Sequence, residues 1–328
     1  PTPEAGWTTI ATIGVPPQFM FDTAPIQFRS YNDATITSAP TTPVYYRIVS
    51  FMKVDVTPDT YREVDWAPAY FKTTAPGEAL LVNTYGGAGN DIVRALAVDN
   101  SGNIYVVATF IGTIVVGSNT YTSTAGTQDI LLLKLNSVGA LQWSKHYGSS
   151  GSETPVCLAI DSLGNIIIAG DFSGTCNFGG SDVTAPQTTD CFIAKYDNSG
   201  NYLWARTFGA SETDNLSSIA CDTLDNIIVC GTFAGTINVG GMSLSSNQGA
   251  YDTFVVKYPP GTAPTAPNAT FATHFADLGG GDKGLGVAVN KNDNSIIITG
   301  FTDSGGLDFG GGRLLDSGGY IVKLNSSL

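Results

Sequence analysis

An acidic residue follows an aromatic residue by six or seven positions at four places in the chain: Asp91, Glu153, Asp214 and Asp282. Carboxylates are the ligands that hard cations prefer, so four of them around one opening could hold Ca²⁺ or a cationic ligand group. Alternatively, each carboxylate accepts hydrogen bonds from backbone N–H groups of its own turn, which repetition would explain equally well. These four residues are therefore our candidate metal ligands, with turn capping as the competing interpretation.

A second acidic position precedes an apolar run in three segments of the chain: Asp129, Asp190 and Asp252. In the corresponding fourth segment Gly318 takes its place, so we interpret this acid as a turn residue. The two histidines, His146 and His274, occupy one equivalent position in two of the segments. We expect them on outermost strands and far apart, and therefore expect no shared site.

The five cysteines include no Cys-x-x-Cys pair and, with two histidines in the chain, form no metal-binding pattern. Cys176 and Cys191 replace apolar strand residues of one segment, and a disulfide between them is one alternative if their strands are neighbours. Cys157, Cys221 and Cys230 align with alanine or valine and are expected to be small core residues. The odd total leaves at least one thiol unpaired.

Signatures of catalysis are absent from the sequence. It contains no Gly-x-Ser-x-Gly elbow, phosphate-binding glycine loop, zinc-binding helix or EF-hand spacing. The many carboxylates leave an acid/base pair open, but none stands out by its spacing. We therefore name no catalytic residue and expect a protein that is not an enzyme.

All these residues belong to a segment that the chain repeats four times. One marker is a tight polar turn, which begins at Asp99, Asp161, Asp222 and Asn290. Another is a lysine that ends an apolar run: Lys134, Lys195, Lys257 and Lys323. The turns are 62, 61 and 68 residues apart and the lysines 61, 62 and 66. Two independent markers with one period indicate an internal repeat of the kind found in stacked or radial arrays.

Each repeat has the pattern of four β-strands. In the first repeat, residues 94–98 lead into the polar turn and residues 104–108 leave it, as in a hairpin. After a glycine-rich excursion, residues 130–134 and 141–147 give a third and a fourth strand. No window carries a sustained helical stripe. The sequence therefore predicts an all-β propeller of four blades, or five if a degenerate blade precedes them.

We expect the chain to close its own ring. The fourth repeat ends soon after Lys323 and lacks a fourth strand, whereas residues 79–87 resemble one. There Leu81 and Tyr85 take the places of Trp143 and Tyr147. Pairing of this segment with the last blade would lock the first and last repeats together and remove an open sheet edge.

Five short motifs recur in the same order in most repeats. In the third repeat they are Phe208-Gly209, an acidic loop with Ile219-Ala220-Cys221-Asp222, Asn226-Ile227-Ile228-Val229, Gly231-Thr232-Phe233-Ala234-Gly235-Thr236 and Asp252-Thr253-Phe254-Val255-Val256-Lys257. By these motifs residues 79–328 resemble the SBBP-type β-propeller repeat family, with four repeats visible, at about 79–147, 148–208, 209–275 and 276–328. The resemblance implies a bacterial, secreted or surface-exposed module and no particular reaction.

Composition narrows the range of partners. The chain has 328 residues, 42% of them hydrophobic and only 13% charged, with 39 glycines, which suits a turn-rich β protein. Its net charge is −13, and residues 79–328 carry 20 acidic against 10 basic side chains. Nucleic acid and anionic membranes are poor partners for such a surface. No apolar run is long enough to span a bilayer, and we expect the start at Pro1 to be that of a processed form.

Residues 1–78 do not align with the repeats and carry twelve aromatic side chains. One interpretation is a small β domain or degenerate blade packed on the ring. The other is an arm whose aromatic residues bind a partner or a neighbouring subunit. The partner-binding candidates are Trp7, Phe19, Phe21, Tyr45 and Tyr46. A proline-rich insertion at 259–267 is expected to be an exposed, stiff loop.

Two functions remain open. We expect a non-enzymatic extracellular, cell-surface or virion-surface propeller, which acts as a structural, decorating or adhesive interaction module attached through residues 1–78. That role requires a protein partner or self-assembly. The alternative is a carbohydrate-binding or carbohydrate-active protein with a site at the channel mouth, near Tyr105. An enzyme of that kind needs a deep pocket with at least two convergent carboxylates.

Overall fold

The computed structural model describes residues 84–210, 214–246, 251–261, 263–276, 281–303, 307–310 and 317–326, without the side chains of 186–188, and the backbone of six earlier strands. The chain divides into two compact units, Pro1–Val82 and Asn83–Leu328. The first contains β1 (Trp7–Thr12), β2 (Gln27–Tyr31), β3 (Val44–Tyr46), β4 (Ser50–Lys53), β5 (Tyr61–Val64) and β6 (Phe71–Thr73). They pair as β1–β2, β3–β6 and β4–β5.

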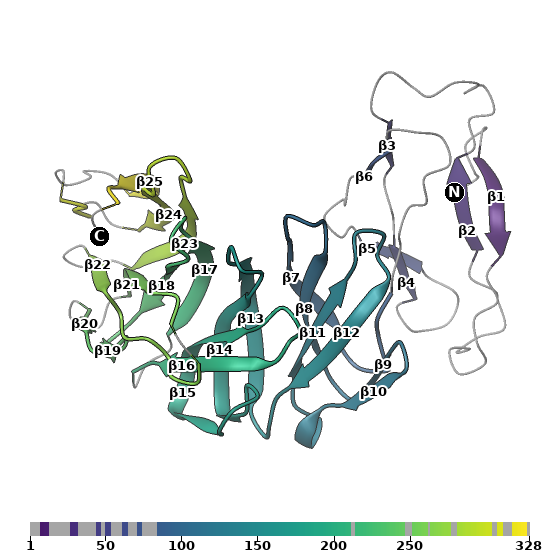
Figure 1. The fold of residues 1–328 in the computed structure, drawn as a ribbon, viewed down its shortest axis with the longest axis horizontal. Coiled ribbons are helices and arrows are strands. Elements are labelled where there is room, and N and C mark those ends of the chain that lie inside the picture. The colour runs from purple at the N-terminus through teal and green to yellow at the C-terminus, as the bar shows by residue number, and fades with distance from the viewer. Residues whose placement is uncertain are drawn as a thin grey trace. The chain divides into compact units, whose positions relative to one another are not determined.

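The second unit is built from four antiparallel sheets, one for each repeat (Figure 1). The first sheet contains β7 (Ile92–Val98), β8 (Ile104–Phe110), β11 (Asp129–Leu135) and β12 (Leu141–Tyr147). The second contains β13 (Ser152–Ile160), β14 (Ile166–Cys176), β15 (Val183–Tyr196) and β16 (Tyr202–Phe208). The third contains β17 (Asn215–Cys221), β18 (Ile227–Phe233), β21 (Asp252–Tyr258) and β22 (Phe271–Phe275). The fourth contains β23 (Asp282–Val289), β24 (Ile296–Thr302) and β25 (Gly318–Leu324).

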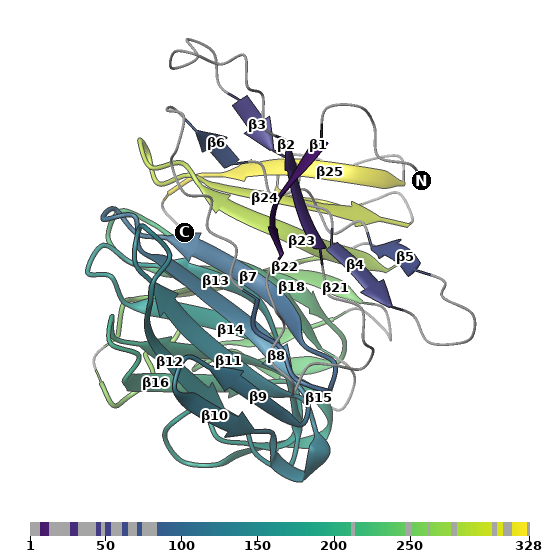
Figure 2. The ribbon, with the colours of Figure 1, turned by 90° about the vertical axis from the view of Figure 1, so that its right-hand side faces the viewer.

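Strands follow one another within each sheet in chain order, so β7, β8, β11 and β12 lie side by side (Figure 2). The first strands of consecutive sheets are neighbours: β7 lies beside β13, β13 beside β17, and β17 beside β23. The fourth strand is therefore at the far edge of its sheet. The described residues contain no α-helix, as the absence of a helical stripe predicted.

Apolar side chains cover both faces of the middle strands of the second and third sheets, because each of these two sheets is packed between two others. In β15, Phe192 and Ala194 belong to a core shared with the first sheet, whereas Cys191 and Ile193 belong to a core shared with the third. A third core, around Ile298, joins the third sheet to the fourth. Side chains alternate across a strand, so a strand buried on both faces has the continuous apolar run seen in the sequence.

A β-bulge interrupts the first strand of every sheet at the same place. The register shifts by one residue at Arg94, Val156, Ser217 and Leu285. A bulge bends its strand and increases the local twist. It thereby shapes the strands along which all four sheets adjoin. No sequence pattern indicated this feature.

The glycine-rich excursion after the second strand forms a second hairpin. It is β9 (Thr113–Val116) with β10 (Asn119–Thr122) in the first repeat, followed by the 3-10 turn η2 (Thr124–Gly126). In the second repeat it extends β14 and β15, and in the third it is β19 (Thr236–Asn238) with β20 (Ser243–Ser245).

The predicted closing strand is not paired with the fourth sheet in the described part of the chain. Residues 79–83 lie outside the described residues, and Gly87 forms an isolated bridge with Ile114 of the first repeat. The neighbour of β25 that the structure describes is β24. Figure 1 shows β25 well separated from β7, so the first and last sheets do not adjoin in the described residues.

We expect Ile193→Ala to lower the free energy of unfolding by about 2–5 kcal/mol, because it empties part of a core that two sheets share. Urea unfolding followed by fluorescence of the buried Trp204 measures the change. Leu224→Ala is the matched control, since Leu224 is 69% exposed at a hairpin turn. Equal midpoints for both variants would contradict the packing of the second sheet on the third.

Candidate functional site

The first set of recurrent acids lies where the chain crosses from one sheet to the next. Glu153, Asp214 and Asp282 are fully buried at the start of a first strand. The backbone N–H groups of all three donate to carbonyl oxygens of the preceding repeat, those of Gln128 at 3.0 Å, Thr189 at 3.3 Å and Tyr251 at 2.7 Å. This position therefore joins consecutive sheets through its backbone.

Two of these acids cap the turns before them. Asp91 Oδ2 accepts a hydrogen bond from the N–H of Gly87 at 2.6 Å, and Asp214 Oδ2 accepts one from the N–H of Ala210 at 2.5 Å. Each N–H lies four residues before its carboxylate, which is the turn-capping interpretation. Within the described part of the chain, no three acidic, histidine or cysteine side chains converge to hold a metal ion. Binding of Ca²⁺ by the four recurrent acids thus stays a prediction, and these contacts favour the turn-capping interpretation instead.

Glu153 carries a neutral carboxyl group at the junction of the first two sheets. Burial raises its pKa to about 8, and the nearby Asp129 carboxylate adds to the rise. Asp171 behaves similarly at the next junction, where burial raises its pKa to about 7 although it accepts a hydrogen bond from the N–H of Leu216 at 2.8 Å. Asp171 was not singled out in the sequence, because Thr109 and Thr232 stand at its place in the neighbouring repeats.

Each histidine lies against the second recurrent acid of its own repeat. His146 Nε2 is 2.6 Å from Asp129 Oδ2, which also accepts a hydrogen bond from the N–H of Thr124. His274 Nε2 is 3.8 Å from Asp252 Oδ2, and burial lowers the pKa of His274. The histidines are on the fourth strands β12 and β22, as expected, but their pairing with the acids was missed. The sequence feature that could have revealed this pairing is that the histidine and the second recurrent acid occur together in the first and third repeats.

In the second and third repeats, the lysine that marked the repeat forms an ion pair with the aspartate that marked it. Lys195 Nζ is 2.9 Å from Asp161 Oδ2, with the two side chains 4% and 1% exposed. Lys257 and Asp222 form the same pair at 3.2 Å. The Asp161 and Asp222 carboxylates also accept backbone N–H bonds two and four residues ahead, which fixes the polar turn. In these two repeats the two markers are therefore structural partners.

Side chains of one turn bind the turn of the next sheet. Ser162 donates to Asp225 through its N–H at 2.7 Å and its hydroxyl at 2.6 Å. Thr223 makes the same two bonds to Asn294, at 3.1 and 2.9 Å. Asp225 and Asn294 have φ angles of 61° and 54°, a conformation that Asn and Asp tolerate better than most residues. These bonds join the second, third and fourth sheets along their turns.

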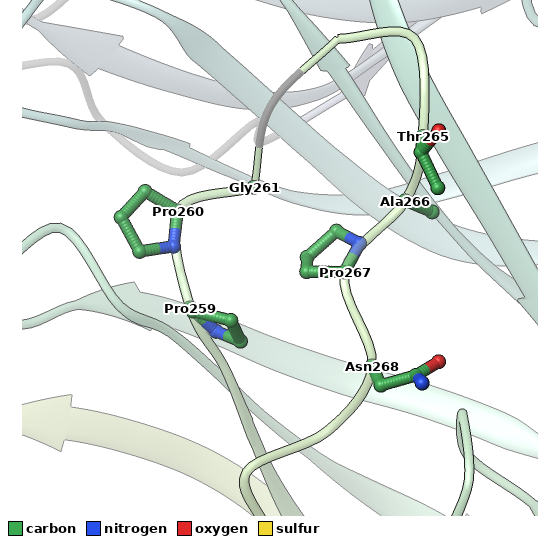
Figure 3. Close-up of a pocket in the computed structure, with 7 residues that line it drawn as sticks. All are labelled: Pro259, Pro260, Gly261, Thr265, Ala266, Pro267 and Asn268. Carbon is green, nitrogen blue, oxygen red and sulfur yellow. The ribbon is translucent and has the colours of Figure 1, made fainter.

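The proline-rich insertion folds back onto the second sheet. Lys195 Nζ donates to the carbonyl of Pro260 at 3.0 Å, and Arg206 donates to that of Pro267 at 2.8 Å. Residues of the loop line an open pocket of about 530 Å³ (Figure 3). Its lining residues are Pro259, Pro260, Gly261, Thr265, Ala266, Pro267 and Asn268. None carries a carboxylate, so the pocket lacks the acid pair that a carbohydrate-active site needs.

Cys176 and Cys191 do not form the disulfide that the sequence left open. Both are free thiols, and Cys176 belongs to the core with the first sheet whereas Cys191 belongs to the core with the third. Burial raises the pKa of all five thiols, which keeps the reactive thiolate scarce. Cys157, Cys221 and Cys230 pack as the small core residues they were expected to be.

The partner-binding candidates of the first unit lie outside the described side chains. Trp7 is part of β1, and Tyr45 and Tyr46 are part of β3, whose backbones alone are described. Phe19 and Phe21 lie outside the described residues altogether. Among the described residues, no helix has the length and apolar character needed to span a membrane.

Fold and contacts define an all-β repeat array in which recurrent polar residues join the sheets. Two curated proteins are similar to parts of this chain. One is an uncharacterized WD repeat-containing protein of Acanthamoeba polyphaga mimivirus, 30% identical over 172 residues, or 48% of this chain and 12% of that protein. The other is the Regulatory protein FlaEY of Caulobacter vibrioides, 26% identical over 292 residues, or 80% of this chain and 28% of that protein. No family model matches the chain.

Replacement of Lys195 by methionine should lower the free energy of unfolding by about 3–5 kcal/mol, because it leaves the Asp161 carboxylate buried without its partner. Chemical denaturation of the wild type and of the Lys195→Met variant measures the difference in the free energy of unfolding. The control is Lys323→Met. Lys323 also forms an ion pair with an aspartate, Asp293, at 3.0 Å, but these two side chains are 58% and 49% exposed. A loss as large in the control would show that burial does not set the strength of this pair.

The contribution of Glu153 to the stability of the protein should fall as pH rises from about 4.5 to about 8. Over that range Glu153 is ionised in the unfolded chain but stays protonated in the folded one, so the folded state binds the extra proton. Thermal melting across this range, compared with Glu153→Gln, checks the prediction. The melting temperature of the variant should rise relative to that of the wild type as pH increases. Below about pH 4.5 the difference between the two melting temperatures should stay constant. Parallel curves over the whole range would contradict the raised pKa.

Proposed function

We propose that this chain is a β-propeller-type interaction module without enzymatic activity, displayed on a cell or particle surface and attached through residues 1–78. The observation that carries the proposal is the use of its recurrent polar groups. Aspartates, lysines, a histidine and hydroxyl side chains of the repeats bind groups of their own sheet or of the next sheet. Such a molecule supplies a rigid surface rather than a reactive centre.

Several observations support the propeller architecture within this proposal. Three four-stranded antiparallel sheets and a last one of three strands follow one another with their first strands adjoining, and the fourth strand of each of the first three lies at the far edge. This is the arrangement of strands within and between propeller blades. The name of the mimivirus relative refers to WD repeats, which form such blades. The motif order shared with the SBBP-type family agrees with it.

The surface and attachment roles rest on composition and on the division of the chain. Charged residues make up only 13% of the chain and the net charge is −13, which disfavours nucleic acid as a partner. Residues 1–82 form a unit separate from the repeats and are rich in the aromatic residues that dominate protein interfaces. A module attached through one unit leaves the other free to be displayed.

Fluorescently labelled full chain, added from outside, should be retained on the producing cells or particles, and flow cytometry after washing measures the amount. We expect the double variant Tyr45→Ser/Tyr46→Ser to lose at least about tenfold in retention, since it removes two candidate anchors. Leu224→Ser, at an exposed turn of the repeats, is the control and should behave as wild type. Equal retention of the double variant, or no retention of the wild type, would overturn the proposal.

A further inference from the structure

Trp204, on β16, carries an indole N–H group that no acceptor satisfies in the described part of the chain. The side chain is 1% exposed, so the group is shielded from solvent as well. Buried donors in folded proteins are nearly always paired, because an unpaired one costs free energy that a partner would recover. This N–H group therefore indicates a place where a partner is missing.

The first junction shows which kind of partner the group lacks. Trp143 lies opposite Lys134 in the first sheet. Trp204 has the same register in the second sheet, opposite Lys195. The indole N–H of Trp143 donates to the carbonyl oxygen of Asn198 in the next sheet at 3.2 Å, and Lys134 Nζ donates to the same oxygen at 3.4 Å. One turn carbonyl thus serves both side chains at the first junction.

The proline-rich insertion takes the place of this turn at the second junction. Asn198 belongs to a tight turn between β15 and β16, whereas residues 259–270 connect β21 to β22. Lys195 still has an acceptor, the carbonyl oxygen of Pro260 at 3.0 Å. The N–H group of Trp204 has none among the residues that the structure describes. The insertion therefore keeps one of the two hydrogen bonds and loses the other.

The pocket of the insertion lies next to the unpaired N–H group. Figure 3 shows the two arms of the insertion facing each other, one with Pro260 and Gly261 and the other with Pro267. A Cβ atom added to Gly261 would lie 2.8 Å from Trp204 Nε1 and 2.8 Å from Pro267 Cδ. The indole nitrogen thus borders the gap between the two arms. The pocket volume of about 530 Å³ is in the usual range of ligand sites.

The hydrogen bonds around the pocket define the chemistry of a ligand that fits it. The carbonyl oxygens of Pro260 and Pro267 already accept hydrogen bonds from Lys195 and Arg206, at 3.0 and 2.8 Å. The site therefore offers a donor beside apolar proline rings, and a suitable ligand brings an acceptor on an apolar body. A ligand N–H group would need an acceptor of its own. The amide before a proline residue meets both conditions, because it has a carbonyl oxygen and no N–H group.

We propose that the pocket at residues 259–268 binds an extended proline-rich segment of a partner protein, with one peptide carbonyl accepting from the indole N–H of Trp204. Such segments have no internal hydrogen bonds, so their carbonyl oxygens are available to a partner. A glycan suits the pocket less well, because its hydroxyl groups need many polar partners and the lining side chains that supply them are Thr265 and Asn268. This inference goes beyond the proposed surface role and rests on the pocket alone.

Nuclear magnetic resonance of the full chain, labelled at the indole nitrogens of its 4 tryptophans, tests the contact directly. The Trp204 signal is the one that the Trp204→Phe variant removes, and the Trp143 signal is identified in the same way. Addition of acetyl-hexaproline amide should move the Trp204 signal downfield and reach saturation below about 1 mM. The Trp143 signal should stay in place, because its N–H group already has an acceptor.

Titration calorimetry with the same peptide measures the effect of the variants. Trp204→Phe keeps an aromatic ring but removes the donor, and it should weaken binding by at least about tenfold. Trp143→Phe is the matched control and should bind as the wild type does. Circular dichroism checks that both variants are folded. If Trp204→Phe is not, Gly261→Ala replaces it, since the added methyl group closes the gap beside the indole nitrogen and should abolish binding.

Four results would overturn the proposal. The first is an unmoved Trp204 signal, and the second is equal affinity of the wild type and the variant at the pocket. The third is equally tight binding of acetyl-(Gly-Ser)3-amide, whose peptide groups all carry N–H donors. The fourth is a Trp204 signal that N-acetylglucosamine moves and the proline peptide does not, which would assign the pocket to a glycan. All are measured on purified protein, so they are independent of retention on cells or particles.

Discussion

Face-to-face packing of sheets that are apolar on both sides is the constraint on which the structure depends. The second strands and third strands carry apolar residues on either face, as Leu131 and Leu132 do in β11. A sheet of this kind cannot stand in water alone, because burial of one face still leaves the other exposed. The repeats must therefore stack. The shared bulge, the adjoining first strands and the short crossings between sheets are the geometry by which they do so.

Polar groups at the junctions follow from the same constraint. A charge or an N–H group enclosed between two sheets needs a partner, since its burial without one costs several kcal/mol. Asp161 meets Lys195, Ser162 meets Asp225, and Glu153 keeps its proton. Acidic residues that recur in a repeat protein can thus have one structural role performed once per junction. Recurrence alone is weak evidence for a ligand site.

The sequence predicted those features of the fold that depend on local order along the chain. It predicted the period, the tight turns, the absence of helices and the strands of each repeat. It left open whether Asp91 and Asp214 hold a cation or cap a turn, and the contacts favour the cap. Contacts between side chains on different strands could not be predicted from the sequence. The pairing of His146 with Asp129, the buried Asp171 and the separation of Cys176 from Cys191 each depend on the register of strands that are distant in the chain.

Sequence by itself determined that this protein is a four-fold repeat of β-strands with an acidic surface and an aromatic-rich first segment. The alternation of apolar and polar residues depends on neighbours in the sequence, and the repeat shows the same pattern four times. Only the tertiary structure decided which face of each strand meets which sheet, and hence that Ile321 and Leu96 are exposed where their counterparts are buried. The physical reason is that the residues are alike in all four repeats, whereas their burial depends on having a neighbouring sheet, which is a property of position in the array.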